Sequence, residues 1–153
     1  MARNYATHTP TAAIALGAAT RTCVARIDAP ANQIVAVNGI DIEFDGIVVT
    51  DKPVLVEVLR VTSAGTGMSA RNPLQTKPKA TAIQTTGAVG PVTAGNLPTA
   101  SDVLRTFFVH PQAGVFYPWQ RDLEIEIAGG GRLAVFLTAP AAVNALTTLA
   151  LEE

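Results

Sequence analysis

The sequence contains little of the material from which several kinds of functional site are built. Its 153 residues include one cysteine, two histidines and 5% aromatic residues. Because Cys23 has no second cysteine to pair with, an intrachain disulfide and a cysteine-based zinc cluster are excluded. We expect Cys23 to be a free, buried thiol.

Long apolar runs and a strong net charge are also missing. No stretch of 18 apolar residues occurs, and the first ten residues lack the pattern of a secretory leader, which is a charged segment followed by an apolar one. The formal net charge of −1 provides no general attraction to nucleic acid or to an anionic membrane. We therefore expect a soluble protein, made in the cytoplasm, that binds neither nucleic acid nor membrane.

The sequence is rich in segments typical of β-strands. Residues 40–46 alternate apolar and acidic side chains with period two, and residues 53–61 are nearly continuous in Val and Leu. We predict that these two segments are neighbours in a β-sandwich. The other predicted strands are 20–27, 33–37, 80–85, 104–109, 123–127, 132–138 and 143–151. A helix at 141–151 is the alternative at the C-terminus, but its Val and Thr residues favour a strand.

Three of these segments predict two particular arrangements. Residues 123–127 and 132–138 each carry one aliphatic face, and three glycines at 129–131 lie between them, which predicts a β-hairpin. The strand at 53–61 is apolar on both faces, so both faces must be covered. The long loop or another subunit could cover the outer face, and the second alternative predicts an oligomer.

Two segments lack the strand pattern of the body. Residues 1–19 predict an extended N-terminal arm, ahead of a single sandwich domain at 20–153, and residues 64–102 form a Gly/Pro-rich excursion. An ordered flap and simple surface disorder are both open for this excursion. Residues 62–101 contain no acidic residue. The positive charge of this segment either keeps the loop solvated or lets it dock on an acidic partner surface. Our candidate partner-interface residues are Tyr5, Ile14, Leu16, Arg71, Lys77 and Lys79.

Residues suited to catalysis are few. His8 and His110 stand in no catalytic motif, and no Ser/His/Asp order is readable. Paired acids could hydrolyse glycosides, but alternating Glu on an exposed strand face more often serves solubility. The acids concerned are Glu43, Glu57, Glu124 and Glu126. Residues 116–119, with Phe116, Tyr117 and Trp119, could form a sugar-stacking platform or a packed loop. We expect no enzyme activity, no cofactor and no bound metal.

Five strand and turn segments resemble a group of small virion proteins of tailed bacteriophages. These are Ile-Glu-Phe-Asp-Gly at 42–46, Pro-Val-Leu-Val-Glu-Val-Leu-Arg at 53–60, Thr-Ser-Ala-Gly-Thr at 62–66, Val-His-Pro-Gln-Ala-Gly at 109–114 and Ala-Pro-Ala-Ala-Val-Asn at 139–144. The resemblance spans about residues 20–151.

This resemblance implies a jelly-roll-like antiparallel β-sandwich. It also implies a capsid decoration, or cement, protein that binds the major capsid protein lattice as a homotrimer on the outer surface of the virion. The alternative that we keep is a phage tail or head-fibre component that binds a glycan of the host surface. No functional residue transfers one by one from the resemblance.

Overall fold

The chain folds into strands and their connections, without a helix in the part that the structure describes. A computed structural model describes residues 4–45, 52–77 and 81–153. Their strands are β1 (Tyr5–His8), β2 (Ile14–Leu16), β3 (Arg21–Asp28), β4 (Val35–Phe44), β5 (Val54–Val61), β6 (Ser69–Ala70), β7 (Leu74–Gln75), β8 (Thr86–Val92), β9 (Ala100–Val109), β10 (Val115–Pro118), β11 (Ile125–Ile127), β12 (Arg132–Thr138) and β13 (Val143–Glu152).

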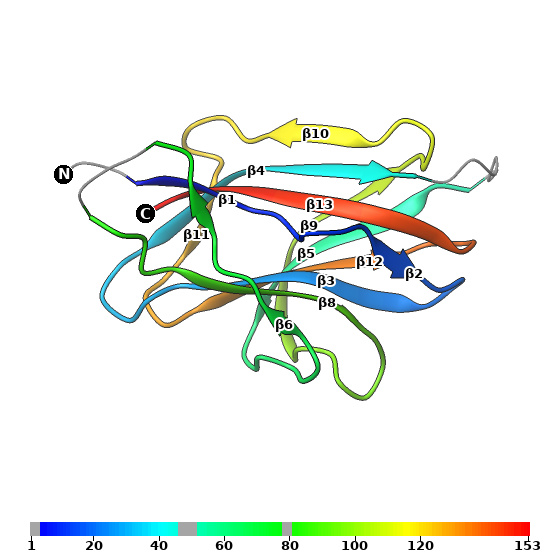
Figure 1. The fold of residues 1–153 in the computed structure, drawn as a ribbon, viewed down its shortest axis with the longest axis horizontal. Coiled ribbons are helices and arrows are strands. Elements are labelled where there is room, and N and C mark those ends of the chain that lie inside the picture. The colour runs from blue at the N-terminus through cyan, green and yellow to red at the C-terminus, as the bar shows by residue number, and fades with distance from the viewer. Residues whose placement is uncertain (1–3, 46–51, 78–80) are drawn as a thin grey trace.

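The strands form two antiparallel sheets that pack face to face (Figure 1). One sheet has the order β10-β4-β13-β1-β7, with β11 also paired to β4 and β2 to β13. The other has the order β6-β8-β3-β12-β5-β9. The first and last described residues lie side by side, because the Asn4 N–H donates to the Glu153 carbonyl at 2.8 Å. The predicted all-β sandwich is thus confirmed, while its jelly-roll subtype stays a prediction.

The main core lies between the sheets and follows from the alternation of side chains. In β4, Ile40 and Ile42 are fully buried, whereas Asp41 and Glu43 point away from the core. β13 repeats the pattern and is a strand, as the Val and Thr content of the C-terminal segment predicts. The predicted neighbours at 40–46 and 53–61 belong to opposite sheets, where they face each other across this core rather than pairing.

A second, smaller core lies on the outer face of the six-stranded sheet, meaning the face turned away from the other sheet. It consists of Cys23, Leu59, Val61, Val92, Ala134 and Phe136. Met68 and Leu97 pack against it, and both come from the excursion at 64–102. The chain itself therefore covers the outer side of Leu59, so the long loop and not another subunit buries this part of the doubly apolar strand.

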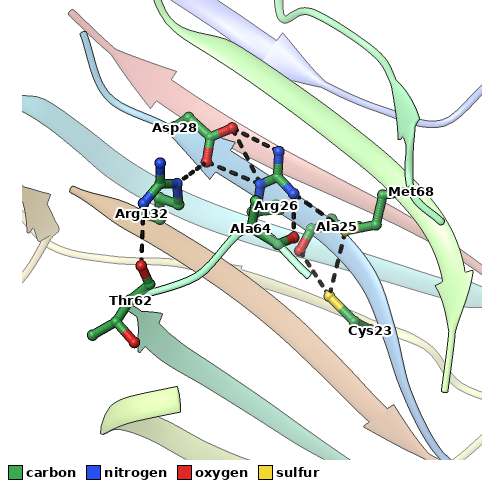
Figure 2. A network of polar contacts seen from close by, with 8 residues as sticks. All are labelled: Cys23, Ala25, Arg26, Asp28, Thr62, Ala64, Met68 and Arg132. Atoms are coloured by element: carbon green, nitrogen blue, oxygen red, sulfur yellow. Dashed lines mark hydrogen bonds and ion pairs between the residues drawn. The ribbon is translucent and has the colours of Figure 1, made fainter. Parts of the chain in front are cut away.

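Figure 2 shows how polar contacts fix this cover. The Arg26 guanidinium pairs with Asp28 at 2.8 Å and donates to the Ala64 carbonyl, while Arg132 lies 3.2 Å from Asp28. Arg132 also donates to the Thr62 carbonyl at 3.3 Å. The free thiol of Cys23 is buried beneath, as predicted, and burial raises its pKa to about 12, so the thiol stays protonated.

The excursion at 64–102 contains strands, although not at the predicted position. β8 pairs with β3 over most of its length, and β9 begins at Ala100, so the ends of the excursion belong to the six-stranded sheet. The predicted strand at 80–85 lies too early, because the strand begins at Thr86; residue 80 lies outside the described residues. Gly87 has a tertiary reason to stand in this strand: a Cβ there would lie 2.6 Å from the His8 ring.

The N-terminal segment is part of the sandwich rather than a separate arm. β1 pairs with β13 and β7, and β2 pairs with β13. Ile14 and Leu16 alternate with the exposed Ala15 and are only 6% and 2% exposed. Such short segments, of four and three residues, carry too few side chains for the alternation to be recognised in the sequence.

The predicted hairpin at 123–138 is also wrong. β11 pairs with β4, whereas β12 pairs with β3 and β5 in the other sheet. The three glycines therefore carry the chain from one layer to the other. The two aliphatic faces do meet, since Ile125, Ile127, Leu133 and Val135 share the main core, but they meet across the sandwich.

Candidate functional site

A polar cavity of about 300 Å³ opens beside the paired ends of β1, β4 and β13. Its lining residues are Tyr5, Asn38, Trp119, Arg121, Glu124 and Glu152. Three of them come from strands of the seven-stranded sheet, and three from the connection between β10 and β11. This volume is at the lower end of the range for small-molecule sites in proteins.

A β-bulge positions one side of this cavity. The register of β4 against β13 passes from Val37 to Gly39, so Asn38 is the extra residue. The Asn38 carbonyl accepts a hydrogen bond from the Trp119 N–H at 2.8 Å. Gly39 allows the approach, since a Cβ there would lie 3.3 Å from Pro118 Cα. The Asn38-Gly39 pair, which predicts a turn or a bulge, thus brings Asn38 and Trp119 together.

The cavity combines aromatic surface with hydrogen-bonding groups of both kinds. Trp119 is only 8% exposed, and its indole Nε1 is buried without a hydrogen-bond partner among the described residues. Asn38 Nδ2 lies 3.4 Å from a Glu152 carboxylate oxygen, and Glu124 accepts from the Asp122 N–H at 2.8 Å. The lining can therefore donate through Asn38 and accept through carboxylates, while the Trp119 Nε1 is closed off from the cavity.

A second, shallow and mainly apolar groove of about 490 Å³ lies on the outer face of the six-stranded sheet. Leu55 stands opposite both Phe108 and Thr138 in the register, so the three share this face. The full lining is Ala19, Lys52, Pro53, Leu55, Phe108, Thr138, Ala139 and Pro140. Phe108 is 66% exposed, which is unusual for a large apolar side chain.

The groove borders an apolar edge of the sandwich. β9 and β10 are the last strands of their sheets, and Val103, Phe116 and Tyr117 are exposed on them. The Phe107 and Tyr117 rings stack at 5.8 Å, which links the two edges. Two register shifts between β5 and β9 mark bulges, and bulges discourage open edge-to-edge pairing.

The predicted partner-interface residues do not form one surface. Ile14 and Leu16 are core residues, which removes them from any docking surface. Tyr5 lines the polar cavity, and the Lys77 ammonium lies 4.7 Å from its ring centroid. Arg71 Nε donates to the Thr9 carbonyl at 3.1 Å and so ties the excursion to the N-terminal segment. Lys79 lies outside the described residues.

The residues considered for catalysis are dispersed. His8 is fully buried, His110 is exposed and accepts from the Gln112 N–H at 3.3 Å, and Glu57 pairs with Arg21 at 2.8 Å. Within the described ranges, no group of three or more His, Cys, Asp or Glu side chains is placed to hold a metal ion. The same residues include no helix long and apolar enough to cross a membrane.

Sequence reasoning did not find either site as a whole. The sequence predicts a platform or packed loop at Trp119, but about 80 residues separate Trp119 from Asn38, and the pairing of β10 with β4 brings the two together. The sequence predicts that Phe108 lies in a strand, but it does not predict which face of the sheet carries Phe108. That depends on the neighbouring strand, which local sequence does not identify. No family model, no curated protein and no solved structure matches this chain.

Proposed function

We propose that this chain is a virion structural protein, which decorates and stabilises a phage capsid by binding the major capsid protein lattice as a trimer. The resemblance of five strand and turn segments to small phage virion proteins supports the class. The apolar groove around Phe108 is the observation that carries the docking part, because it is a mainly apolar surface that includes a large exposed aromatic side chain.

The groove suits a stable, non-catalytic contact. Removing a large side chain such as Phe108 or Leu55 from water contributes about 1.5–3 kcal/mol per residue when burial is complete. Flanking prolines, Pro53 and Pro140, hold the rim in a fixed backbone conformation, which lowers the entropy lost on docking. A modest contact of this kind becomes strong when several copies bind one lattice.

The proposed mechanism is mechanical. A decoration protein that binds the assembled shell and not its separated subunits shifts the equilibrium toward the assembled shell by mass action. Contacts that bridge neighbouring capsid subunits add buried area, and this area is lost only when the lattice comes apart. The protein would sit on the outer surface of the virion.

A Phe108→Ser substitution tests the docking part. We expect at least about tenfold weaker binding to purified heads that lack this protein, since a loss of 1.4 kcal/mol is tenfold. Co-sedimentation measures it, and the disruption temperature of the heads should fall accordingly. Phe116→Ser is the control, because Phe116 is equally exposed but lies outside the groove. Equal binding by both variants would contradict the groove as the docking surface.

The trimer is tested separately. Light scattering of the purified protein is expected to give about three times 15.9 kDa. Because Met68 and Leu97 cover the outer side of Leu59, we place self-association at another exposed apolar surface, the sheet edge at Val103. A Val103→Lys variant should then form a smaller assembly, with a lower mass by light scattering. A monodisperse species of 15.9 kDa at micromolar concentration would contradict the trimer and leave groove docking intact.

A further inference from the structure

A short part of the excursion contacts both the N-terminal strand and the smaller core. Residues 66–77, which we call the cover segment, contain β6 and β7, and these two-residue strands pair with β8 and β1. Every residue of the cover segment is described, and none belongs to either buried hydrophobic cluster; Met68 only packs against the smaller one. Segments with so few buried apolar contacts open at a lower free-energy cost than the core of a domain.

The ring of His8 is buried against this segment. A Cβ built on Gly87 would lie 2.6 Å from His8 Nε2 and 2.9 Å from the Arg71 carbonyl oxygen, so the ring, β8 and the cover segment meet at one point. Neither ring nitrogen has a hydrogen-bond partner among the described residues. A protonated ring would be a buried charge with two N–H donors to satisfy, which is unfavourable unless water can reach it.

The cover segment is held to its neighbours mainly by backbone hydrogen bonds. The Arg71 N–H donates to the Gly87 carbonyl at 2.8 Å, and the Thr76 N–H donates to the Tyr5 carbonyl at 2.9 Å. Arg71 Nε adds the contact with the Thr9 carbonyl. Such bonds can be exchanged for bonds to water at a modest net cost. Release of this segment therefore gives an imidazolium access to water without separating the two sheets.

The charges around His8 favour the same outcome. The charged groups that face the ring are Arg71 on the cover segment, and Arg26 and Asp28 on β3. β8 carries no charged residue, and the one acid of β13 pairs with Tyr5 at the other end of β1. Two cations against one acid leave a net positive charge near the ring, which opposes an imidazolium in the closed protein.

We propose that the cover segment is a pH-sensitive flap, which is released from β1 and β8 when His8 is protonated, while the two sheets stay folded. Release withdraws Met68, whose sulfur lies 3.9 Å from Cys23 Sγ (Figure 2). Acid would then uncover the smaller core on the outer face of the six-stranded sheet. The flap does not depend on capsid docking, because other described residues line the groove around Phe108.

Cys23 reports the opening, because it is the only thiol in the chain. The full-length protein is labelled with a dipyridyl disulfide, which reacts with thiols even in acid, at pH 7 and pH 4.5. Each rate is divided by the rate of the urea-unfolded protein at the same pH. We expect this normalised rate to rise about fiftyfold in acid, because the pKa of His8 is about 4 in the closed protein and 6.5 when water reaches the ring. An unchanged rate overturns the proposal.

Low concentrations of urea separate a flap from global unfolding. Local opening exposes little surface, so the labelling rate at pH 4.5 should depend only weakly on urea below the unfolding transition. A steep dependence, equal to that of global unfolding, would mean that the whole sandwich opens, and the proposal would then be wrong.

Three variants test the assignment to His8. His8→Leu should have the same normalised rate at both pH values, whereas His110→Gln, which changes the exposed histidine, should keep the acid acceleration. Met68→Ala should be labelled faster at both pH values with the same ratio between them, because it removes the contact over Cys23 and leaves His8 in place. Circular dichroism shows that each variant is folded. Acid acceleration that His8→Leu retains would overturn the assignment.

Discussion

Acidification from pH 6.5 to pH 4 is expected to lower the free energy of unfolding by about 3 kcal/mol through His8 alone. His8 is fully buried and neither ring nitrogen has a hydrogen-bond partner among the described residues. Burial lowers the pKa of His8 from 6.5 to about 4, which outweighs the Arg71 backbone and the Asp28 charge that favour the imidazolium. The charges of Arg71 and Arg26 oppose the imidazolium and act in the same direction as burial.

The direction of this effect follows from the two pKa values. Between pH 6.5 and 4 the unfolded chain binds a proton at His8 that the folded protein does not, so acid favours unfolding. The contribution of His8 to stability is complete above pH 6.5 and is lost as the pH falls toward 4. Carboxyl groups titrate at the lower end of this range, so a variant is needed to isolate the histidine.

Chemical denaturation at pH 7 and pH 4.5 provides the measurement. A His8→Leu variant, which keeps an apolar side chain of similar size in the site, should lose most of the difference between the two pH values that the parent shows. The control is His110→Gln, because His110 is the other histidine and is exposed. If His8→Leu retains the full pH dependence, the buried histidine is not its source.

Removing residues 1–19 is expected to abolish folding, whereas a separate arm would be dispensable. β1 and β2 supply backbone hydrogen bonds to β13, and Ala6, His8, Ile14 and Leu16 are buried in the sandwich. Loss of these side chains and of two strands exceeds the 5–15 kcal/mol that typically stabilises a domain. Far-UV circular dichroism and solubility of the truncated protein measure the result.

A point substitution gives the same test in a milder form. Leu16→Ala should lower the free energy of unfolding by about 2–5 kcal/mol, because it leaves a cavity in the main core. Ala15→Ser, at the exposed position between the two buried residues, should change it by less than about 0.5 kcal/mol. If the truncated protein is fully folded, or if Leu16→Ala is as stable as the parent, the N-terminal segment is a separate arm after all.

The sequence by itself determined the secondary-structure class and most of the strands. Alternation with period two is a property of neighbouring residues, so β3, β5, β12 and β13 could be located within one or two residues. The nearly continuous Val and Leu residues at 53–61 predicted two apolar faces for that strand. The count of one cysteine likewise needed no structure to exclude a disulfide.

Only the tertiary structure decided which strands pair and which surfaces remain open. Pairing of β1 and β2 with β13 depends on residues more than 120 positions apart, and β11 and β12 entered different sheets although their sequences suit a hairpin. The candidate sites depend on the same distant pairings, since β10 beside β4 brings Trp119 to Asn38. Local alternation fixes which way a side chain points, but its burial depends on the segment that arrives to cover it.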